Sequence, residues 1–347
     1  FNKPYSPQSD GIMKQNLPNL LFLIFTLNLF VFVSCDEDES RPTFPLSAEI
    51  FYSADGKQVA FTALTHSAVT WNWDFGDGNT SNEKDPVHVY EEGGYYLATL
   101  TATDASGATV TKEVTLALDL TAFDLLVGDP TREGYDGKTW KLSATHSPND
   151  ILANSDANLS LFDEGIPSLP AGAFDLFLGL PEAYNDEFTF YHDGSYKHNT
   201  TDGTTFGGIV NAFVLQQFGL TEITKTGGED VLGQDAFAIT TFTPDENATF
   251  ELKEGDDYDL PSAFPTGTNA MGIPIVTYSG VTTIDFPGTD EFVGIRDFHR
   301  KVIVQNITDD SMRLIMFLTL SPDAIISQDP LIALATTALV LTFNVVK

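Results

Sequence analysis

The chain has 347 residues, of which 49 are acidic and 17 are Lys or Arg, so its formal net charge at pH 7 is −32. Such a surface repels phosphate backbones, which excludes nucleic acid as a partner, because nucleic-acid binding depends on cations that neutralise phosphates. The single cysteine excludes a disulfide within the chain, and 42% apolar residues exclude a disordered polyanion. The chain must therefore fold around packed cores, and its length is typical of about two domains.

The first 34 residues have the parts of an export signal. An apolar stretch runs from Leu20 to Val33 behind Lys14. It is too short to cross a bilayer, which takes about 20 apolar residues. Residues 1–12 precede Met13, which makes a better start, so we expect them to be upstream sequence. The sequence predicts that residues 1–34 are removed and do not fold.

The only cysteine, Cys35, follows the apolar stretch directly in the string "FVSC". This string resembles the lipobox of bacterial lipoproteins, whose cysteine receives the lipid and becomes the first residue of the mature protein. The resemblance implies a lipid anchor at Cys35, and several acyl chains hold a protein durably on a membrane. The alternative is a thiol in a discarded leader.

An acidic string, "DEDES", follows the cysteine in residues 36–40. It resembles the export signal of Bacteroidetes surface lipoproteins, which implies that the protein sits on the outer face of the outer membrane. The alternative is a solvated linker. In either case residues 35–46 are expected to form an acidic linker ahead of the first domain.

Residues 47–118 have the pattern of an antiparallel sandwich. Apolar and polar residues alternate in "VTWNWDF" (69–75), which predicts a half-buried strand, and Gly76-Asp77-Gly78 predicts the tight turn that ends it. A second alternation covers 96–102, and a last strand is expected through 110–114.

The strings "WDFGDG", "PVHVY", "GGYY" and "LTATDASG" at these spacings resemble a polycystic-kidney-disease (PKD) domain. The resemblance implies an immunoglobulin-like β-sandwich that serves as a spacer or interaction module, with Trp73 and Phe75 in its core. Trp71 is either a packing residue or a sugar platform. Asp74 and Asp77 either hold the turn or bind calcium.

A linker rich in Asp and Gly is expected over 119–136, and residues 137–347 again have the pattern of strands. A hairpin is predicted over 186–201 with its turn at Asp193-Gly194, and another across Asp309-Asp310. A strand is expected at the end of the chain and one helix over 206–220. The predicted fold class is all-β, an immunoglobulin-like PKD β-sandwich followed by a larger β-sandwich or jelly-roll-like domain with one helix.

Catalytic motifs are absent from the sequence. There is no G-x-S-x-G string and no H-E-x-x-H string. A glycoside hydrolase needs two carboxylates about 5 to 9.5 Å apart, and no acidic run places them on one face of a strand. We therefore assign no catalytic residue, no metal ligand and no cofactor, and expect no enzyme. "DDYD" at 256–259 is the best run for calcium, which binds oxygen ligands, and an acidic turn is its alternative.

The second domain resembles the C-terminal modules that follow PKD domains in Bacteroidetes surface lipoproteins of glycan-utilisation systems, through "GKTWKL", "TFYHDGSY" and "ITDDSMRL". The resemblance implies a surface glycan-binding protein that acts beside a glycan transporter complex. Sugar rings stack on aromatic faces, so the candidate carbohydrate-binding residues are Trp140, Tyr184, Tyr191 and Tyr258. A core position is the alternative for Trp140.

The acidic surface favours a neutral polysaccharide unless a local basic patch exists, and "GIRDFHRK" (294–301) is the only short basic cluster. Two other functions stay open. One is a structural or adhesive surface protein in which the PKD domain is a spacer. The other is a polysaccharide-degrading enzyme.

Overall fold

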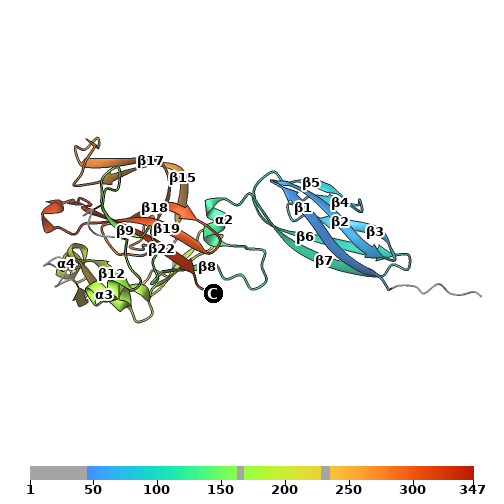
Figure 1. Cartoon of the computed structure of the whole chain (residues 1–347), viewed down its shortest axis with the longest axis horizontal. Helices are drawn as coiled ribbons and strands as arrows, with labels where there is room; N and C mark the ends of the chain where they lie inside the picture. Colours follow the sequence, from blue (N-terminus) through green and yellow to red (C-terminus); the bar gives the residue numbers. More distant parts are fainter. Residues whose placement is uncertain (1–44, 162–167, 228–234) are drawn as a thin grey trace, which may run out of the picture.

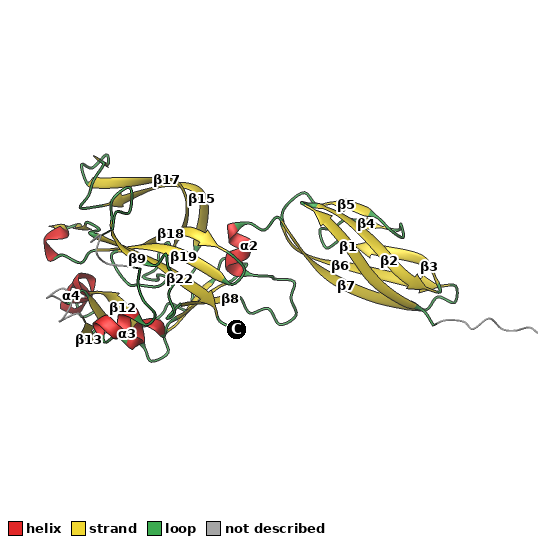
Figure 2. Cartoon of the chain, viewed as in Figure 1, coloured by secondary structure: helices red, strands yellow, loops and turns green. Residues whose placement is uncertain are grey.

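The computed structural model describes residues 45–161, 168–227 and 235–347, so the leader, Cys35 and "DEDES" lie outside the described residues. Two β-rich bodies follow one another along the longest axis of the molecule (Figure 1). Strands dominate both, and the helices are short and confined to the second body and its approach (Figure 2). No helix in the described ranges is long and apolar enough to cross a membrane.

The first body is a sandwich of two antiparallel sheets, as predicted. One sheet has the order β1 (Ser47–Asp55), β2 (Gln58–His66), β5 (Val87–Val89), and the other has the order β4 (Thr80–Ser81), β3 (Ala68–Asp74), β6 (Gly94–Asp104), β7 (Thr109–Leu118). Trp73 and Phe75 are buried between the sheets, which confirms their core assignment. Trp71 is partly buried and its Nε1–H donates to Thr65 Oγ1 at 3.2 Å, so it mainly packs.

The turn after β3 uses both aspartates of "DFGDG". Asp74 Oδ1 accepts the N–H of Gly76 at 2.9 Å, and Asp77 Oδ1 accepts the N–H of Asn79 at 3.0 Å. Gly76 has a φ of +79°, which a side chain would disfavour. The carboxylates are engaged by the turn, and this geometry favours the turn interpretation over calcium.

The expected linker over 119–136 contains a helix, α2 (Ala122–Val127). Thr121 and Asp124 cap it reciprocally in a capping box. Leu126 and Val127 are fully buried in the core of the second body. The prediction of a plain linker was wrong for this part, because its apolar residues pack into the second body.

The main sheet of the second body has ten strands. In order they are β11 (Tyr196–Asn199), β10 (Glu187–Phe190), β8 (Lys138–Leu142), β22 (Thr337–Val345), β19 (Ser311–Leu318), β18 (His299–Ile307), β17 (Pro274–Asp285) and β15 (Glu251–Pro261), with β16 (Gly267–Thr268) beside β17 and β9 (Ile151–Asn154) beside β22. The predicted 186–201 hairpin is confirmed. Its turn is longer than expected, because Tyr191 pairs with Ser195.

The central strands are buried on both faces. In β19, Leu314 and Met316 face the larger core, whereas Ile315 and Phe317 face a smaller core. Tyr258 of β15 belongs to the smaller core. This arrangement explains why β22 is a nearly continuous apolar run, where one apolar face was expected.

Smaller elements cover one side of the main sheet (Figure 1). They are the three-stranded sheet β12 (Thr204–Gly208), β14 (Phe237–Thr241), β13 (Ile223–Gly227), the helices α3 (Ala173–Leu178) and α4 (Ile209–Gln217), and the hairpin β20 (Ile325–Gln328), β21 (Leu331–Ala333). The helix predicted over 206–220 is confirmed as α4, although residues 206–208 end a strand. The structure adds the short helices α2 and α3.

Candidate functional site

The principal candidate site is a cleft of about 560 Å³ beside α4. We call it the α4 cleft. Its lining comes from Asn211, Val214, Leu215, Phe218 and Leu220 in and after α4, from Asp290 and the stretch 296–300, from 331–333 in and around β21, and from Pro261 and Ile273. Segments far apart in the sequence therefore meet at one hollow.

Two glycines bring α4 and the stretch 296–300 together. Gly208 is the N-cap of α4, and a Cβ on it would lie 2.2 Å from Asp297 Oδ2. A Cβ on Gly207 would lie 3.0 Å from the carbonyl oxygen of Arg296. Because any side chain at Gly208 would push this stretch away, the pair fixes the position of the cleft wall.

The rim of the α4 cleft is apolar and open to solvent. Phe218 is 71% exposed, Leu220 is 64% exposed and Leu331 is 42% exposed. An exposed phenyl ring beside polar groups is the arrangement that sugar rings need, because they present apolar C–H faces and hydroxyl groups together.

The "GIRDFHRK" cluster forms a wall of the cleft, but most of its charges are already paired or neutral. Arg300 Nη1 donates to Asp290 Oδ1 at 2.7 Å, and Lys301 Nζ lies 2.6 Å from Asp256 Oδ2. Burial lowers the pKa of His299 to about 4, so this imidazole is neutral at pH 7. Of the three cationic Arg and Lys residues in this cluster, Arg296 is the one that forms no ion pair with a described residue.

Asp297 is a buried acid next to the same cleft. Its Oδ1 accepts the N–H groups of Phe298 at 2.8 Å and Thr319 at 3.1 Å, while its Oδ2 has no partner. Burial raises the pKa of Asp297 to about 8. At pH 7 this side chain is therefore largely protonated and does not balance the charge of Arg296.

A second hollow of about 370 Å³ lies on the other side of Arg300. It shares Phe298, His299 and Arg300 with the α4 cleft and reaches Lys301 and Tyr258.

The sugar platforms expected from the sequence lie elsewhere. Trp140 is fully buried and its Nε1–H donates to Leu126 O at 2.9 Å, so the core alternative holds. Tyr184 is 8% exposed and Tyr258 is 9% exposed, so neither ring offers a free face. Tyr191 is partly exposed and lies against Gly137. Trp140, Tyr184 and Tyr258 are therefore packed into cores and present no ring to a sugar, whereas the expectation for Tyr191 stays a prediction.

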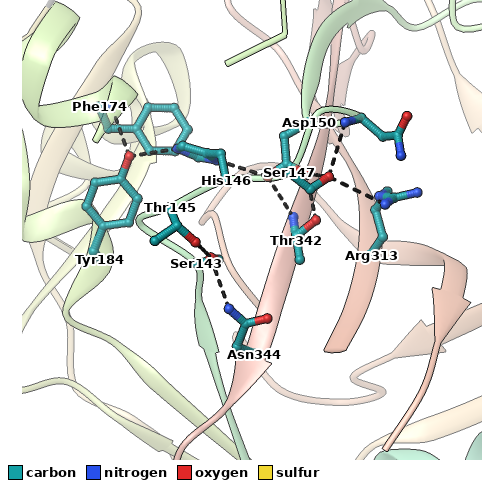
Figure 3. A network of polar contacts seen from close by, with 11 residues as sticks. Ser143, Thr145, His146, Ser147, Asp150, Phe174, Tyr184, Arg313, Thr342 and Asn344 are labelled. Carbon is teal, nitrogen blue, oxygen red and sulfur yellow. Dashed lines mark hydrogen bonds and ion pairs between the residues drawn. The ribbon is translucent and has the colours of Figure 1, made fainter. Parts of the chain in front are cut away.

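Tyr184 belongs to a polar network that resembles a catalytic arrangement (Figure 3). His146 Nδ1 lies 2.9 Å from Asp150 Oδ2, and His146 Nε2 lies 2.8 Å from the Tyr184 hydroxyl. Burial alone would raise the pKa of Asp150, but bonds from His146, Thr342 and Ser147 outweigh it and hold that pKa below its usual value. The side chains of His146 and Asp150 are fully buried, so the network fastens the loop to β22.

A second buried network lies behind the α4 cleft. His198 Nε2 lies 3.1 Å from Asp186 Oδ2, and His198 Nδ1 lies 3.2 Å from Glu291 Oε2. Burial opposes charge on the imidazole, but the bonds to both carboxylates prevail and raise the pKa of His198. Within the described part of the chain, no group of three or more His, Cys, Asp or Glu residues could hold a metal ion.

The expected calcium run at 256–259 lies in strand β15. Successive side chains point to opposite faces of a strand, which separates Asp256 from Asp257 and Asp259. Asp256 bonds Lys301 and Thr283, Asp257 accepts the N–H of Gly280, and Asp259 accepts the hydroxyl of Thr277. The acidic residues thus serve strand contacts and do not form a loop around an ion.

Residues 43–118 match the family model of the PKD domain. This confirms that the first body is a PKD domain. The match covers less than a quarter of the chain and does not reach the second body, where the α4 cleft lies.

Curated relatives share short segments with this chain. Collagenase ColQ1 of Bacillus cereus is 46% identical over 50 residues, which are 14% of this chain and 5% of the collagenase. The pre-pro-metalloprotease PrtV of Vibrio cholerae is 43% identical over 51 residues, which are 15% of this chain and 6% of that protein. The chain therefore matches only about a twentieth of the length of these relatives.

Solved structures include the PKD1 domain of Epp from Vibrio anguillarum, with 31% identity, coverage of 23% of this chain and 99% of that domain, and a TM-score of 0.22. A structure of carbohydrate-binding modules from the β-sandwich superfamily has 13% identity, coverage of 88% of this chain and 93% of that chain, and a TM-score of 0.23.

Proposed function

We propose that this protein binds a polysaccharide in the α4 cleft of its second body and holds it without cleaving it. The observation that carries the proposal is the pairing of an exposed aromatic rim, Phe218, with a polar wall that includes Arg300 and Asp290. A rim of this kind covers one face of a sugar, and the polar wall provides partners for hydroxyl groups.

The rest of the molecule supports a binding role. Large aromatic residues of the PKD domain pack in its core around Trp73, which is consistent with a spacer role for this domain. The two His–carboxylate networks, at His146 and His198, are buried and engaged internally, so neither supplies a free catalytic group at the cleft.

The proposed location is the outer face of the outer membrane. It rests on the resemblance of "FVSC" to a lipobox and of "DEDES" to a surface-export signal. A lipid at Cys35 would anchor the protein, the PKD domain would space the second body from the membrane, and a glycan transporter complex would receive the bound polysaccharide.

The function is tested with protein produced from residues 36–347 and affinity electrophoresis through gels that contain neutral or acidic polysaccharides. We expect at least one polysaccharide to retard the protein, without release of reducing sugar from the same sample. If no polysaccharide retards it, glycan binding is refuted and an adhesive role gains support. Reducing-sugar release would instead show an enzyme.

A further inference from the structure

Arg296 is a buried cation that forms no ion pair with any residue that the structure describes. The residue is among those that line the α4 cleft, it is only 8% exposed, and its buried Nη1 has no hydrogen-bond partner. Its guanidinium carbon lies 4.7 Å from the centre of the Phe242 ring. Ring stacking offsets only part of the free energy that burying an ion costs.

The nearby acids compensate this charge only in part, because burial lowers the pKa of Arg296 although the charges of Asp290 and Glu291 act to raise it. Glu291 is engaged by His198 at 3.2 Å and by the N–H of Asp245 at 2.6 Å. Asp297 keeps its proton at neutral pH, and Asp290 is bonded to Arg300. A buried guanidinium beside a cleft, whose charge is offset only in part by acids that bond other groups, would be stabilised by an anion that a ligand brings.

Arg300 can assist at the same place. Its partner Asp290 has a side chain that is 77% exposed, and the Arg300 side chain is 36% exposed. Ion pairs this open to water stabilise a protein little, so Arg300 can exchange Asp290 for a ligand group at little cost. The cleft would then present two guanidinium groups to one anion.

We propose that the α4 cleft recognises an acidic sugar, a uronic-acid residue within a polysaccharide, whose carboxylate pairs with Arg296 and Arg300. The inference rests on the proposed function and specifies its ligand class. It departs from the neutral ligand that the net charge of −32 favours. The net charge does not prevent such binding, because charges farther away than about 8 Å are largely screened at physiological salt. Contacts between arginine and a carboxylate form at close range and are often bidentate.

The test compares polygalacturonate with highly methyl-esterified pectin, since the ester keeps the backbone and removes most of the charge. Affinity electrophoresis of residues 36–347 should show strong retardation by polygalacturonate, at least about tenfold weaker retardation by the ester, and weaker binding as salt rises. Alginate and a sulfated carrageenan serve as further acidic probes. Retardation by carrageenan alone would assign the anion as sulfate and overturn the uronate proposal.

Matched variants locate the contact. Arg296→Gln and Arg300→Gln should each weaken binding to polygalacturonate by about tenfold, whereas Arg132→Gln, an exposed arginine that does not line the cleft, should leave it unchanged. Arg300→Gln lies at the surface, so it tests the site even if Arg296→Gln fails to fold.

The outcomes separate the two proposals. Binding to neutral laminarin or to the ester as strong as to the acidic probes, or binding that ignores salt, would overturn the acidic-sugar proposal and leave polysaccharide binding intact. Failure of every polysaccharide, neutral and acidic, to retard the wild-type protein would overturn both.

Discussion

The Trp140→Ala variant is expected to lose about 3 to 5 kcal/mol of unfolding free energy, the usual loss for a large aromatic residue removed from a core. Trp140 lies in β8, between Phe188 of β10 and Val345 of β22 in the register of the main sheet. Its indole N–H bonds Leu126 O in α2, so the variant also releases this helix. The loss is a large part of the stability of a typical domain.

Urea unfolding followed by tryptophan fluorescence and circular dichroism measures this loss. Phe218→Ala is the matched control, because Phe218 is 71% exposed. Its removal should leave the free energy of unfolding within about 0.5 kcal/mol of the wild-type value. An unchanged midpoint in Trp140→Ala would show that the indole is not a core residue and would reopen its role as a sugar platform.

Stability should fall as pH rises from 6.5 to 8, and Asp297 should account for about 2 kcal/mol of the fall. The pKa of Asp297 is about 8 in the folded protein against an ordinary 3.8, so the unfolded chain releases a proton that the folded chain keeps. Proton release favours unfolding, and its effect grows until the pH reaches the folded pKa. Below pH 6.5, His299 makes the stability rise with pH. Its pKa of about 4 in the folded protein lies below the ordinary value of 6.5, so the unfolded chain binds a proton that the folded chain does not.

The difference between wild type and Asp297→Asn isolates this residue from other groups that titrate, such as His198. An amide mimics the protonated acid, so the variant should gain about 2 kcal/mol relative to wild type between pH 6.5 and 8. Parallel stability curves for the two proteins across this range would mean that Asp297 is ionised in the fold, which would supply a counter-charge for Arg296.

Much of the fold follows from local patterns in the sequence. The alternation through Trp73 and Phe75 and the turn residues that follow it predict the first sandwich, because both signals lie within a few residues of one another. The helix α4 was also found. The packing of α2 was not, because a short apolar segment among Asp and Gly residues resembles a linker until its partner strand β8 is known.

The site was harder to predict because it depends on contacts between distant segments. The sequence identified "GIRDFHRK" as the only short basic cluster, but it could not show that Arg300 pairs with Asp290 while Arg296 stays unpaired. Phe218 was read as part of a helix pattern. The sequence predicts Tyr184 and Tyr258 as sugar-binding residues, although long-range packing buries both.

The most direct test of the account is the affinity of Phe218→Ala for the polysaccharide that retards wild type most strongly. Phe51→Ala is the matched control, since Phe51 is 59% exposed on β1 of the PKD domain. Loss of the aromatic contact at the rim of the cleft should weaken affinity about tenfold in Phe218→Ala, with no change in Phe51→Ala. Full affinity in Phe218→Ala together with a loss in Phe51→Ala would place glycan binding on the PKD domain and contradict a binding site in the α4 cleft.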